Sequence, residues 1–381
     1  MAKRRANGEG TIFQRKDGRW MAMISLPNGE RRQFINRDRS IVAAQLTEAL
    51  HDQLKGIPIA TSSHTVSQYL AQWLDHTGAS VRPRTHEAYA LNVRRLEPLL
   101  GRTKLAALTP QMIDAAYQQL LGEGLSKRSV EQCHTVLHGA LEKALKWGLV
   151  GRNACDAVTP PRPERSEMKT LSEEQVRRLF EASADDRLHA LWVLLATTGL
   201  RLGEAIGLRW QDIDFALQTL TVRRALQRQR GAGLVFVEPK TRRSRRTIAL
   251  PNGTIAAIQA HRKRQLEERL QVGAAWRDQD LVFCRWDGGP LEPSGLAQRF
   301  DRLLRQAGLP DIRVHDLRHT AASLHLMKGT HPKLVQEMLG HSTITLTLDT
   351  YSHVTPGMHA DAARKMESLF APAATAASAS S

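Results

Sequence analysis

The chain has 381 residues, 41% of them hydrophobic, and a formal net charge of +16. This length predicts two or three domains, and a surface this basic favours binding to nucleic acid, the commonest large polyanion. No membrane span or secretory signal is expected, because no run of about 18 apolar residues occurs and no apolar stretch follows the basic start MAKRRANGEG. The three cysteines are odd in number and lack CxxC spacing, which argues against disulfide or zinc frameworks and, by elimination, for a cytoplasmic protein.

Residues 1–55 predict a small β-rich module followed by a helix. Two alternating runs are separated by the turn signals at 16–18 and 27–29, a pattern typical of hairpins. Ser40 is expected to cap the helical pattern IVAAQLTEALHDQL, which would cover one face of the sheet. The other face could lie in a DNA groove, since β-ribbons fit the major groove, or the module could be purely structural.

A linker is expected at 56–64, and the pattern from 65 to 150 is entirely helical. Four segments space their apolar residues three and four apart, and Thr109 followed by Pro110 is a typical helix start. The segments are TVSQYLAQWLDH, RTHEAYALNVRRLEPLL, TPQMIDAAYQQLL and SVEQCHTVLHGALEKALKW. Four helices of this length predict a compact bundle.

The last domain is expected at 165–370, after a second linker that includes ERSEMKT. Ser172 with Gln175 forms a capping box that begins it. The pattern is mainly helical, with one strand pair near 219–250 that turns at 231–233. Nine Lys or Arg face a single Glu between 223 and 246, so a net +8 falls in this short stretch. The tail 371–381 is of low complexity and is expected to be disordered.

The four tyrosines differ in their surroundings. Tyr69, Tyr89 and Tyr117 occupy apolar-face positions of the predicted bundle, so core packing explains them. Tyr351 is the only tyrosine of the last domain, within the polar and β-branched segment ITLTLDTYSHV. A tyrosine there could be structural, and only the other polar residues of the same domain suggest a catalytic role.

The last domain contains a set of cationic residues and histidines that could act together with Tyr351. His341 lies ten residues before Tyr351, and His315 and Arg318 lie three apart in HDLRHT, on one face of a helix. Arg201 follows Gly199, a residue that ends a helix and exposes what comes next. Lys240 lies at the edge of the predicted hairpin, in EPKTRRSRRTIAL.

Such a set suits the transfer of a phosphodiester to a side chain. Two guanidinium groups can hold the non-bridging oxygens, where charge builds during attack. A free phenol has a pKa of about 10 and needs a base, while the leaving 5′-oxygen needs an acid. Arginine, lysine and histidine provide all of this without a metal or another cofactor.

Each residue also has a simpler explanation. Arg201 with Glu204 could be a helix ion pair, Lys240 one of many surface cations, and His315 a solvated histidine. The spacing of HDLRH matches the zinc motif H-E-x-x-H, but Asp replaces Glu, Arg318 adds a cation and no third ligand follows. We therefore expect no metal. The ordered set is far more specific than any one member.

These residues lie in motifs that closely resemble those of the tyrosine recombinases, the family of bacteriophage lambda integrase and Cre. The matching segments occur in the family's order over most of 170–355: TGLRLGEAIGLRWQDID, PKTRRSRRTIAL, HDLRHTAAS and LGHSTITLTLDTYSHV. By pattern and position, 65–150 resembles the family's helical core-binding domain. More loosely, residues 8–50 resemble the three-stranded arm-binding domain of phage and transposon integrases. The resemblance implies a mainly α chain of three domains, with small sheets and a mixed α/β catalytic domain.

Carried onto this sequence, the resemblance implies a role for each site residue. Arg201 and Arg318 would clamp the scissile phosphate, and Lys240 would protonate the leaving 5′-hydroxyl. His315 would assist proton transfer and His341 would hydrogen-bond the phosphate, with Glu204 orienting the arginine region. Tyr351 would attack and form a 3′-phosphotyrosine. His319 and His353 match common family residues of less certain role.

The resemblance also implies partners and a function. We expect double-stranded DNA with core and arm-type sites, a homotetramer that exchanges strands through a Holliday junction, and accessory DNA-bending or directionality proteins. The phosphotyrosine stores the bond energy, which agrees with the absence of a GxxxxGK[ST] nucleotide motif. The function expected is integration or excision of a phage or other mobile element. Alternatives are a chromosome- or plasmid-resolving recombinase, a type IB topoisomerase-like enzyme, and a DNA-binding protein without catalysis.

Overall fold

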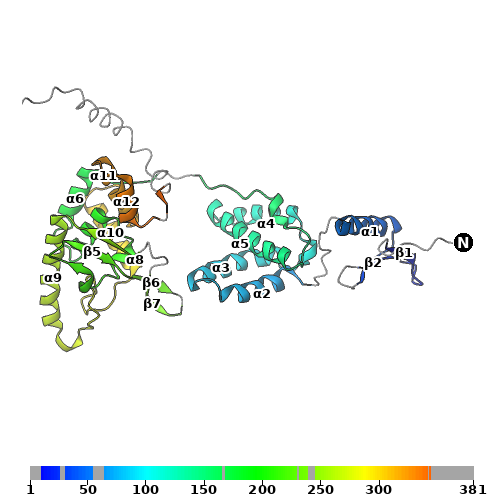
Figure 1. Cartoon of the computed structure of the whole chain (residues 1–381), viewed down its shortest axis with the longest axis horizontal. Coiled ribbons are helices and arrows are strands. Elements are labelled where there is room, and N and C mark those ends of the chain that lie inside the picture. Colours follow the sequence, from blue (N-terminus) through cyan, green and yellow to red (C-terminus); the bar gives the residue numbers. More distant parts are fainter. Residues whose placement is uncertain are drawn as a thin grey trace, which may run out of the picture. The chain divides into compact units, whose positions relative to one another are not determined.

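The computed structural model describes residues 10–25, 31–54, 64–164, 168–229, 231–238, 245–341 and 343–344. The chain divides into two compact units, residues 1–165 and 166–381 (Figure 1). Small antiparallel sheets accompany a mainly helical chain, as expected. Among the described helices, none combines the length and the apolar character that crossing a membrane requires. The second turn signal at 27–29 and the tail at 371–381 lie outside the described residues.

The N-terminal module is a three-stranded sheet with one covering helix. Strands β1 (Thr11–Gln14), β2 (Trp20–Ser25) and β3 (Arg31–Asn36) are antiparallel in that order, and α1 (Arg39–Leu54) packs on β2 and β3. The expected turn at 16–18 joins β1 to β2, with Gly18 at a φ of +81°. The predicted cap was wrong, because Asp38 precedes the helix and its carboxylate accepts from the Ser40 backbone at 2.7 Å.

The predicted four-helix bundle is present and consists of α2 (Val66–Gly78), α3 (Pro83–Leu100), α4 (Pro110–Gly122) and α5 (Lys127–Lys146). A three-residue 3-10 turn, η1 (Leu105–Ala107), joins α3 to α4. Helix α4 starts as expected, with the Thr109 hydroxyl accepting from the Met112 backbone. The apolar core continues beyond 150 through η2 (Ala154–Ala157) to Val158, since that segment packs on α4 and α5.

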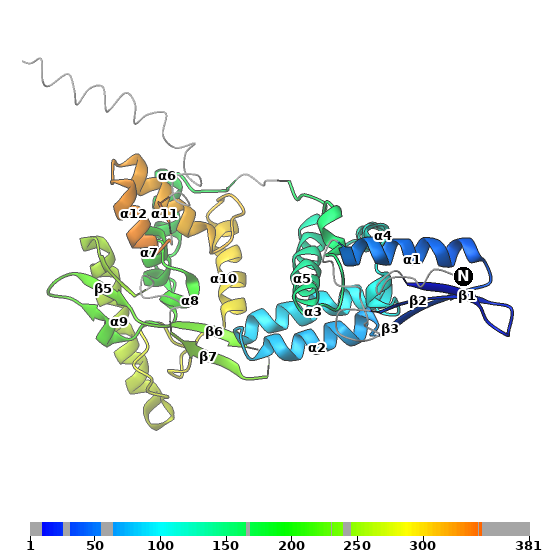
Figure 2. The same cartoon turned by 45° about the vertical axis from the view of Figure 1, so that its right-hand side comes forward.

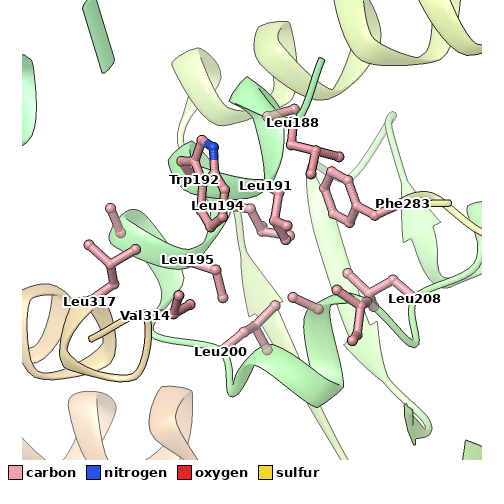
Figure 3. Close-up of a cluster of buried hydrophobic side chains, with 14 of the residues drawn as sticks. Leu188, Leu191, Trp192, Leu194, Leu195, Leu200, Leu208, Phe283, Val314 and Leu317 are labelled. Atoms are coloured by element: carbon pink, nitrogen blue, oxygen red, sulfur yellow. The ribbon is translucent and has the colours of Figure 1, made fainter. Parts of the chain in front are cut away.

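The second unit is arranged around one helix that is apolar on all sides. Helix α7 (His189–Thr198) has eight buried residues out of ten and packs against α9 and α11. Figure 3 shows Leu191, Trp192 and Leu195 of α7 among side chains from other parts of the unit. The surrounding helices are α6 (Glu173–Ala182), α8 (Leu202–Ala205), α9 (Asn252–Val272), α10 (Pro293–Gln306), α11 (Asp316–Met327) and α12 (Pro332–Leu339), with 3-10 turns η3 (Trp210–Asp212) and η5 (Gly273–Ala275). A helix hydrophobic all round belongs at the centre of a domain.

The strands of this unit form two separate sheets instead of the single pair that the sequence suggested. Strands β6 (Ala225–Gln229) and β7 (Gly233–Val237) make the expected hairpin, which projects from the unit in Figures 1 and 2. Strands β4 (Ile213–Asp214), β5 (Thr219–Val222) and β8 (Arg246–Ala249) form a three-stranded antiparallel sheet. Alternation along β8 buries Arg246 and Ile248 and exposes the residues between and after them.

Candidate active site

The site begins at the corner between α7 and α8. Gly199 ends α7 at a φ of +63°, and a Cβ built there would lie 2.6 Å from the Leu339 side chain. Only glycine fits both the left-handed conformation and this close approach. The turn leaves Arg201 as the N-cap of α8, with 43% of its side chain exposed. The predicted role of Gly199 as the end of a helix is therefore confirmed.

Glu204 holds Arg201 from the first turn of α8. One carboxylate oxygen accepts from the Arg201 backbone at 3.0 Å and the other from its guanidinium at 2.9 Å. The Glu204 side chain is only 8% exposed. Burial alone would raise the pKa of Glu204, but hydrogen bonds and charge from Arg246, and then from Arg201, hold it below its ordinary value. A charged Glu204 thus fixes both the backbone and the head group of Arg201.

Arg318 lies in the first turn of α11 and is almost completely buried. Its guanidinium donates to the Gly199 carbonyl at 2.8 Å and to the Leu339 carbonyl at 2.7 Å. These acceptors lie two residues before Arg201 and two before His341. One side chain therefore joins the α7–α8 corner to the end of α12.

Two histidines stand at the start of α11. His315 is its N-cap residue, and its ring meets that of His319 edge to face at a centroid distance of 5.5 Å. Burial, and then the charge of Arg318, lower the pKa of His315, while burial and then His315 lower the pKa of His319. Arg313 and Asp316 fix this end of the helix through a two-bond guanidinium–carboxylate pair at 3.1 and 2.9 Å.

His341 follows α12, which ends at Gly340 with a φ of +68°. Its backbone N–H donates to the Gln336 carbonyl at 3.1 Å, and the Gln336 amide donates to the His341 carbonyl at 3.2 Å. Burial, followed by the charges of Arg318 and Arg201, lowers the pKa of His341 to about 4. His341 is therefore neutral at pH 7 and can donate one hydrogen bond.

The structure brings together four of the six residues expected at the site. Arg201 and Arg318 both act electrostatically on the rings of His315 and His341. The other two, Lys240 and Tyr351, lie outside the described residues, as does His353. Four side chains that are up to 140 positions apart in the sequence thus converge on the ends of α7, α11 and α12.

Sequence reasoning missed Arg246, a buried arginine of β8. Its guanidinium donates to both Glu204 oxygens, at 3.2 and 2.8 Å, and its Nε to the Met338 carbonyl at 2.6 Å. In the sequence it is one of the nine cations of the basic run. The signal that singles it out is strand alternation, because Arg246 shares an inward face with Ile248 and precedes the buried Leu250.

The basic run carries less unbalanced charge than its composition suggests. Each of its five described arginines has an acidic partner: Arg223 and Arg224 pair with Asp212, Arg228 with Glu292, Arg245 with Glu238, and Arg246 with Glu204. Four of these five partnerships use carboxylates outside the run. Part of the net +8 therefore supports the fold of the second unit.

The arrangement can stabilise a negatively charged, tetrahedral or trigonal-bipyramidal oxyanion. Arg201 is nearly half exposed, and the neutral ring of His341 lies within reach of its charge. Fixed donors of this kind act without reorganisation when charge develops on a bound phosphate. Within the described ranges, no three His, Cys, Asp or Glu residues are placed to hold a metal ion.

Comparisons with known proteins agree with this picture. The phage integrase family matches residues 169–358, and the N-terminal SAM-like domain of phage integrases matches residues 65–121. A XerC-like tyrosine recombinase of Caldanaerobacter subterraneus subsp. tengcongensis is 29% identical over 361 residues, which cover 89% of this chain and 92% of the relative. An integrase of Saccharopolyspora erythraea is 26% identical, covering 96% and 98%.

Solved structures show the same fold. The Tn1549 transposon integrase in complex with transposon right end DNA is 25% identical, with a TM-score of 0.70 and coverage of 81% of this chain and 100% of that chain. A lambda integrase dimer bound to a COC′ core site is 17% identical, with a TM-score of 0.56 and coverage of 92% and 96%. The SAM-like match covers α2, α3 and nearly all of α4 of the bundle, and the other match covers residues 169–358 of the second unit, which include the four described site residues. The chain therefore belongs to the phage integrase family of tyrosine recombinases.

Proposed function

We propose that this site-specific recombinase integrates and excises a mobile DNA element through a covalent bond between Tyr351 and a DNA phosphate. The observation that carries the proposal is the convergence of Arg201, His315, Arg318 and His341 at three helix ends. Relatives named as integrases of a mycobacterial phage and of the element ICEBs1 support the mobile-element role.

The proposed reaction is an in-line displacement at phosphorus. The Tyr351 oxygen attacks the scissile phosphodiester, the bond to the 5′-oxygen breaks, and the 3′ side remains linked to the enzyme. Arg201 and Arg318 neutralise the charge that grows on the non-bridging oxygens. A 5′-hydroxyl of the partner duplex then attacks the phosphotyrosine, which releases Tyr351 and forms the new junction. Each step forms one P–O ester bond and breaks another, so the reaction needs no nucleotide hydrolysis.

Protons must move in both steps. In the proposal, Lys240 gives a proton to the departing 5′-oxygen, and His315 takes the phenol proton. The low pKa of His315 fits a ring that is neutral at pH 7 and able to accept. His341, also neutral, donates a hydrogen bond to a non-bridging oxygen.

The proposed substrate is double-stranded DNA, which is supported by the Tn1549 integrase structure with transposon right end DNA and by the lambda integrase dimer bound to a core site. We propose that residues 65–150 bind the core site, that residues 165–370 cleave it, and that residues 1–55 bind arm-type sites. A lambda integrase tetramer bound to a Holliday junction suggests a tetramer here as well. Accessory DNA-bending or directionality proteins and a cytoplasmic location complete the proposal.

Capture of the covalent intermediate tests the proposal and identifies the DNA site in the same experiment. The purified protein is mixed with sheared genomic DNA from its source, denatured with detergent, and the protein-linked fragments are sequenced. We expect fragment ends that map to one short sequence, with Tyr351 as the modified residue by mass spectrometry. Absence of any linked DNA would contradict the proposal and favour a DNA-binding protein without catalysis.

A second assay separates recombination from topoisomerase activity. Two plasmids that carry the mapped site and a supercoiled plasmid without it are incubated with the protein. The proposal predicts joined products only when two sites are present. Relaxation of supercoils without joining would instead indicate a type IB topoisomerase-like enzyme.

A further inference from the structure

Arg246 connects the two halves of the candidate site. On one side it donates two hydrogen bonds to Glu204, the carboxylate that also holds the backbone and guanidinium of Arg201. On the other side its Nε donates to the Met338 carbonyl, three residues before His341. The Arg246 side chain is 6% exposed, so water contributes little to this geometry.

A second contact places the guanidinium directly under the turn that precedes His341. Gly340 adopts a φ of +68°, and a Cβ built there would lie 3.1 Å from the Arg246 Nη1. The last turn of α12 therefore rests on Arg246 and is bonded to it. A shift of Arg246 would move both the α12 end and the carboxylate behind Arg201.

Arg318 makes a parallel connection between the same two segments, from Gly199 to Leu339. Arg318 is itself expected to touch the phosphate, so part of its bonding changes when DNA is bound. Arg246 lies behind Glu204, and its described bonds are to protein groups. The position of Arg201 relative to His341 thus has a support that is independent of the proposed phosphate ligand.

The charge of Arg246 matters as much as its bonds. Glu204 is shared between two guanidinium groups, at 2.9 Å from Arg201 and 2.8 Å from Arg246. Without Arg246, the buried carboxylate would have Arg201 as its main counter-charge. Arg201 would then be drawn toward Glu204 and would neutralise less of the charge on a bound phosphate.

We infer that Arg246 is a positioning residue for strand cleavage, which sets Arg201 through Glu204 and His341 through the end of α12. The inference rests on the proposed function, because it concerns how the proposed phosphate clamp is held. Arg246 touches neither the substrate nor the reacting atoms. Its removal is expected to act on the stabilisation of phosphate charge more than on any other part of the reaction.

The experiment compares two linkages at the mapped cleavage site. One duplex carries the natural phosphodiester, and the other a methylphosphonate, in which a methyl group replaces one non-bridging oxygen and removes the charge. Single-turnover formation of the covalent adduct is measured for wild type and Arg246→Lys. Lysine keeps the charge but cannot form the forked bonds to Glu204 together with the bond to Met338.

We expect Arg246→Lys to cleave the phosphodiester about 10- to 100-fold more slowly than wild type, as a displaced catalytic group does. On the methylphosphonate the deficit should shrink to about threefold or less, since a neutral linkage demands less from Arg201. Wild-type rates on the phosphodiester, or an equal deficit on both linkages, would overturn the inference. A wild-type protein that links to neither duplex would instead refute the proposed function.

A matched control is available in the same unit. Arg187 is a largely buried arginine with two bonds to Glu268, at 2.7 and 2.6 Å, and one to the Cys284 carbonyl at 2.6 Å. Arg187→Lys makes the same chemical change away from the site, so any loss of rate should be equal on both linkages. A linkage-dependent loss in this control would also count against the inference.

Folding is checked by thermal melting of each variant. If Arg246→Lys does not fold, the paired change Arg246→Met with Glu204→Gln removes both buried charges together, which a protein tolerates better than one orphaned charge. We expect this pair to cleave the phosphodiester more slowly than wild type, because Arg201 and the end of α12 both lose their support, and to recover on the methylphosphonate. Equal losses on both linkages would again contradict a positioning role.

Discussion

The helical bundle and the second unit bury polar groups in different ways. Among the described residues 64–164, the buried polar side chains are Asn92 and Asn153, and neither is charged. In the second unit the buried set includes two arginines and four acids: Arg246, Arg318, Glu204, Asp212, Asp287 and Asp316. Burying a charge costs free energy unless it is paired, so its retention calls for an explanation. Four of these six lie at or beside the candidate site.

The tyrosines also differ between the two regions, because those of the bundle are explained by packing and Tyr351 of the second unit stands in a polar and β-branched segment of the sequence. Tyr69 and Tyr117 are completely buried in the bundle, and burial raises the pKa of both phenols. The Tyr69 hydroxyl donates to the Ala140 carbonyl, and that of Tyr117 lies 3.1 Å from the His134 ring. Tyr89 stacks on Trp73 at a centroid distance of 5.3 Å. The prediction that packing explains these three is confirmed, which leaves Tyr351 as the candidate nucleophile.

The largest effect is expected from a change at the phosphate clamp. Arg201→Ala should slow covalent cleavage about 10²- to 10³-fold, the typical cost of losing one oxyanion donor. Its half-exposed side chain means that the melting temperature should change little. Arg177→Ala, which removes a surface arginine paired with Glu173, is the control and should keep the wild-type rate. Cleavage by Arg201→Ala at the wild-type rate would contradict the clamp.

A deletion tests whether the N-terminal module binds DNA of its own. Removal of residues 1–55 should weaken binding to accessory sites about 10- to 100-fold, because a second linked contact is lost. Binding to the isolated core site should change much less. Gel-shift titrations on both sites, at one salt concentration, measure the two losses. Equal losses would argue against an arm-binding module.

A smaller effect is expected in the bundle. Tyr117→Phe should lower the free energy of unfolding by about 1 kcal/mol, the usual net worth of one hydrogen bond. Urea unfolding measures this change, and adduct formation should stay at the wild-type level. A loss of adduct without a loss of stability would mean that the bundle takes part in the chemistry.

Acid should weaken the second unit through its histidines. The pKa of His341 is about 4 in the folded chain, below the value of about 6.5 expected after unfolding. As the pH falls, the unfolded state therefore binds a proton before the folded state does. The contribution of His341 to the free energy of unfolding is fully present above about pH 6.5 and is lost as the pH falls toward 4. Melting temperatures across this range should show the decline, and His341→Gln should flatten part of it. A melting temperature that rises on acidification would be contrary to this.

The sequence predicted the fold where local signals were strong. Pro110 after Thr109 and the pair Ser172–Gln175 mark helix starts that the structure has. The cap at Ser40 was wrong because Asp38 is an equally good capping residue two positions earlier. The second sheet was missed because β4 and β5 are short, and because β5 pairs with β8, which follows it by more than twenty residues.

The candidate site was predicted only in part, because some of its contacts, like those of the second sheet, join segments that are far apart in the sequence. Arg201 and Arg318 occupy recognisable positions in the motifs TGLRLGEAIGLRWQDID and HDLRHTAAS, and in the structure both lie near His315. Arg246 stands in a run of like charges, where strand alternation with Ile248 is its one sequence signal, and its ion pair with the buried Glu204 is visible only in the structure. Burial and ion pairing between distant segments depend on tertiary contacts, and composition does not report them.

The central claim is that the Tyr351 phenol becomes linked to a DNA phosphate. The most direct test is covalent capture of Tyr351→Phe, alongside Tyr117→Phe from the bundle, on a duplex that carries the mapped site and a nick beside the cleavage position, which keeps the adduct from being religated. We predict that Tyr351→Phe forms no adduct yet binds DNA with wild-type affinity, while Tyr117→Phe forms the adduct normally. A covalent product from Tyr351→Phe would contradict the account.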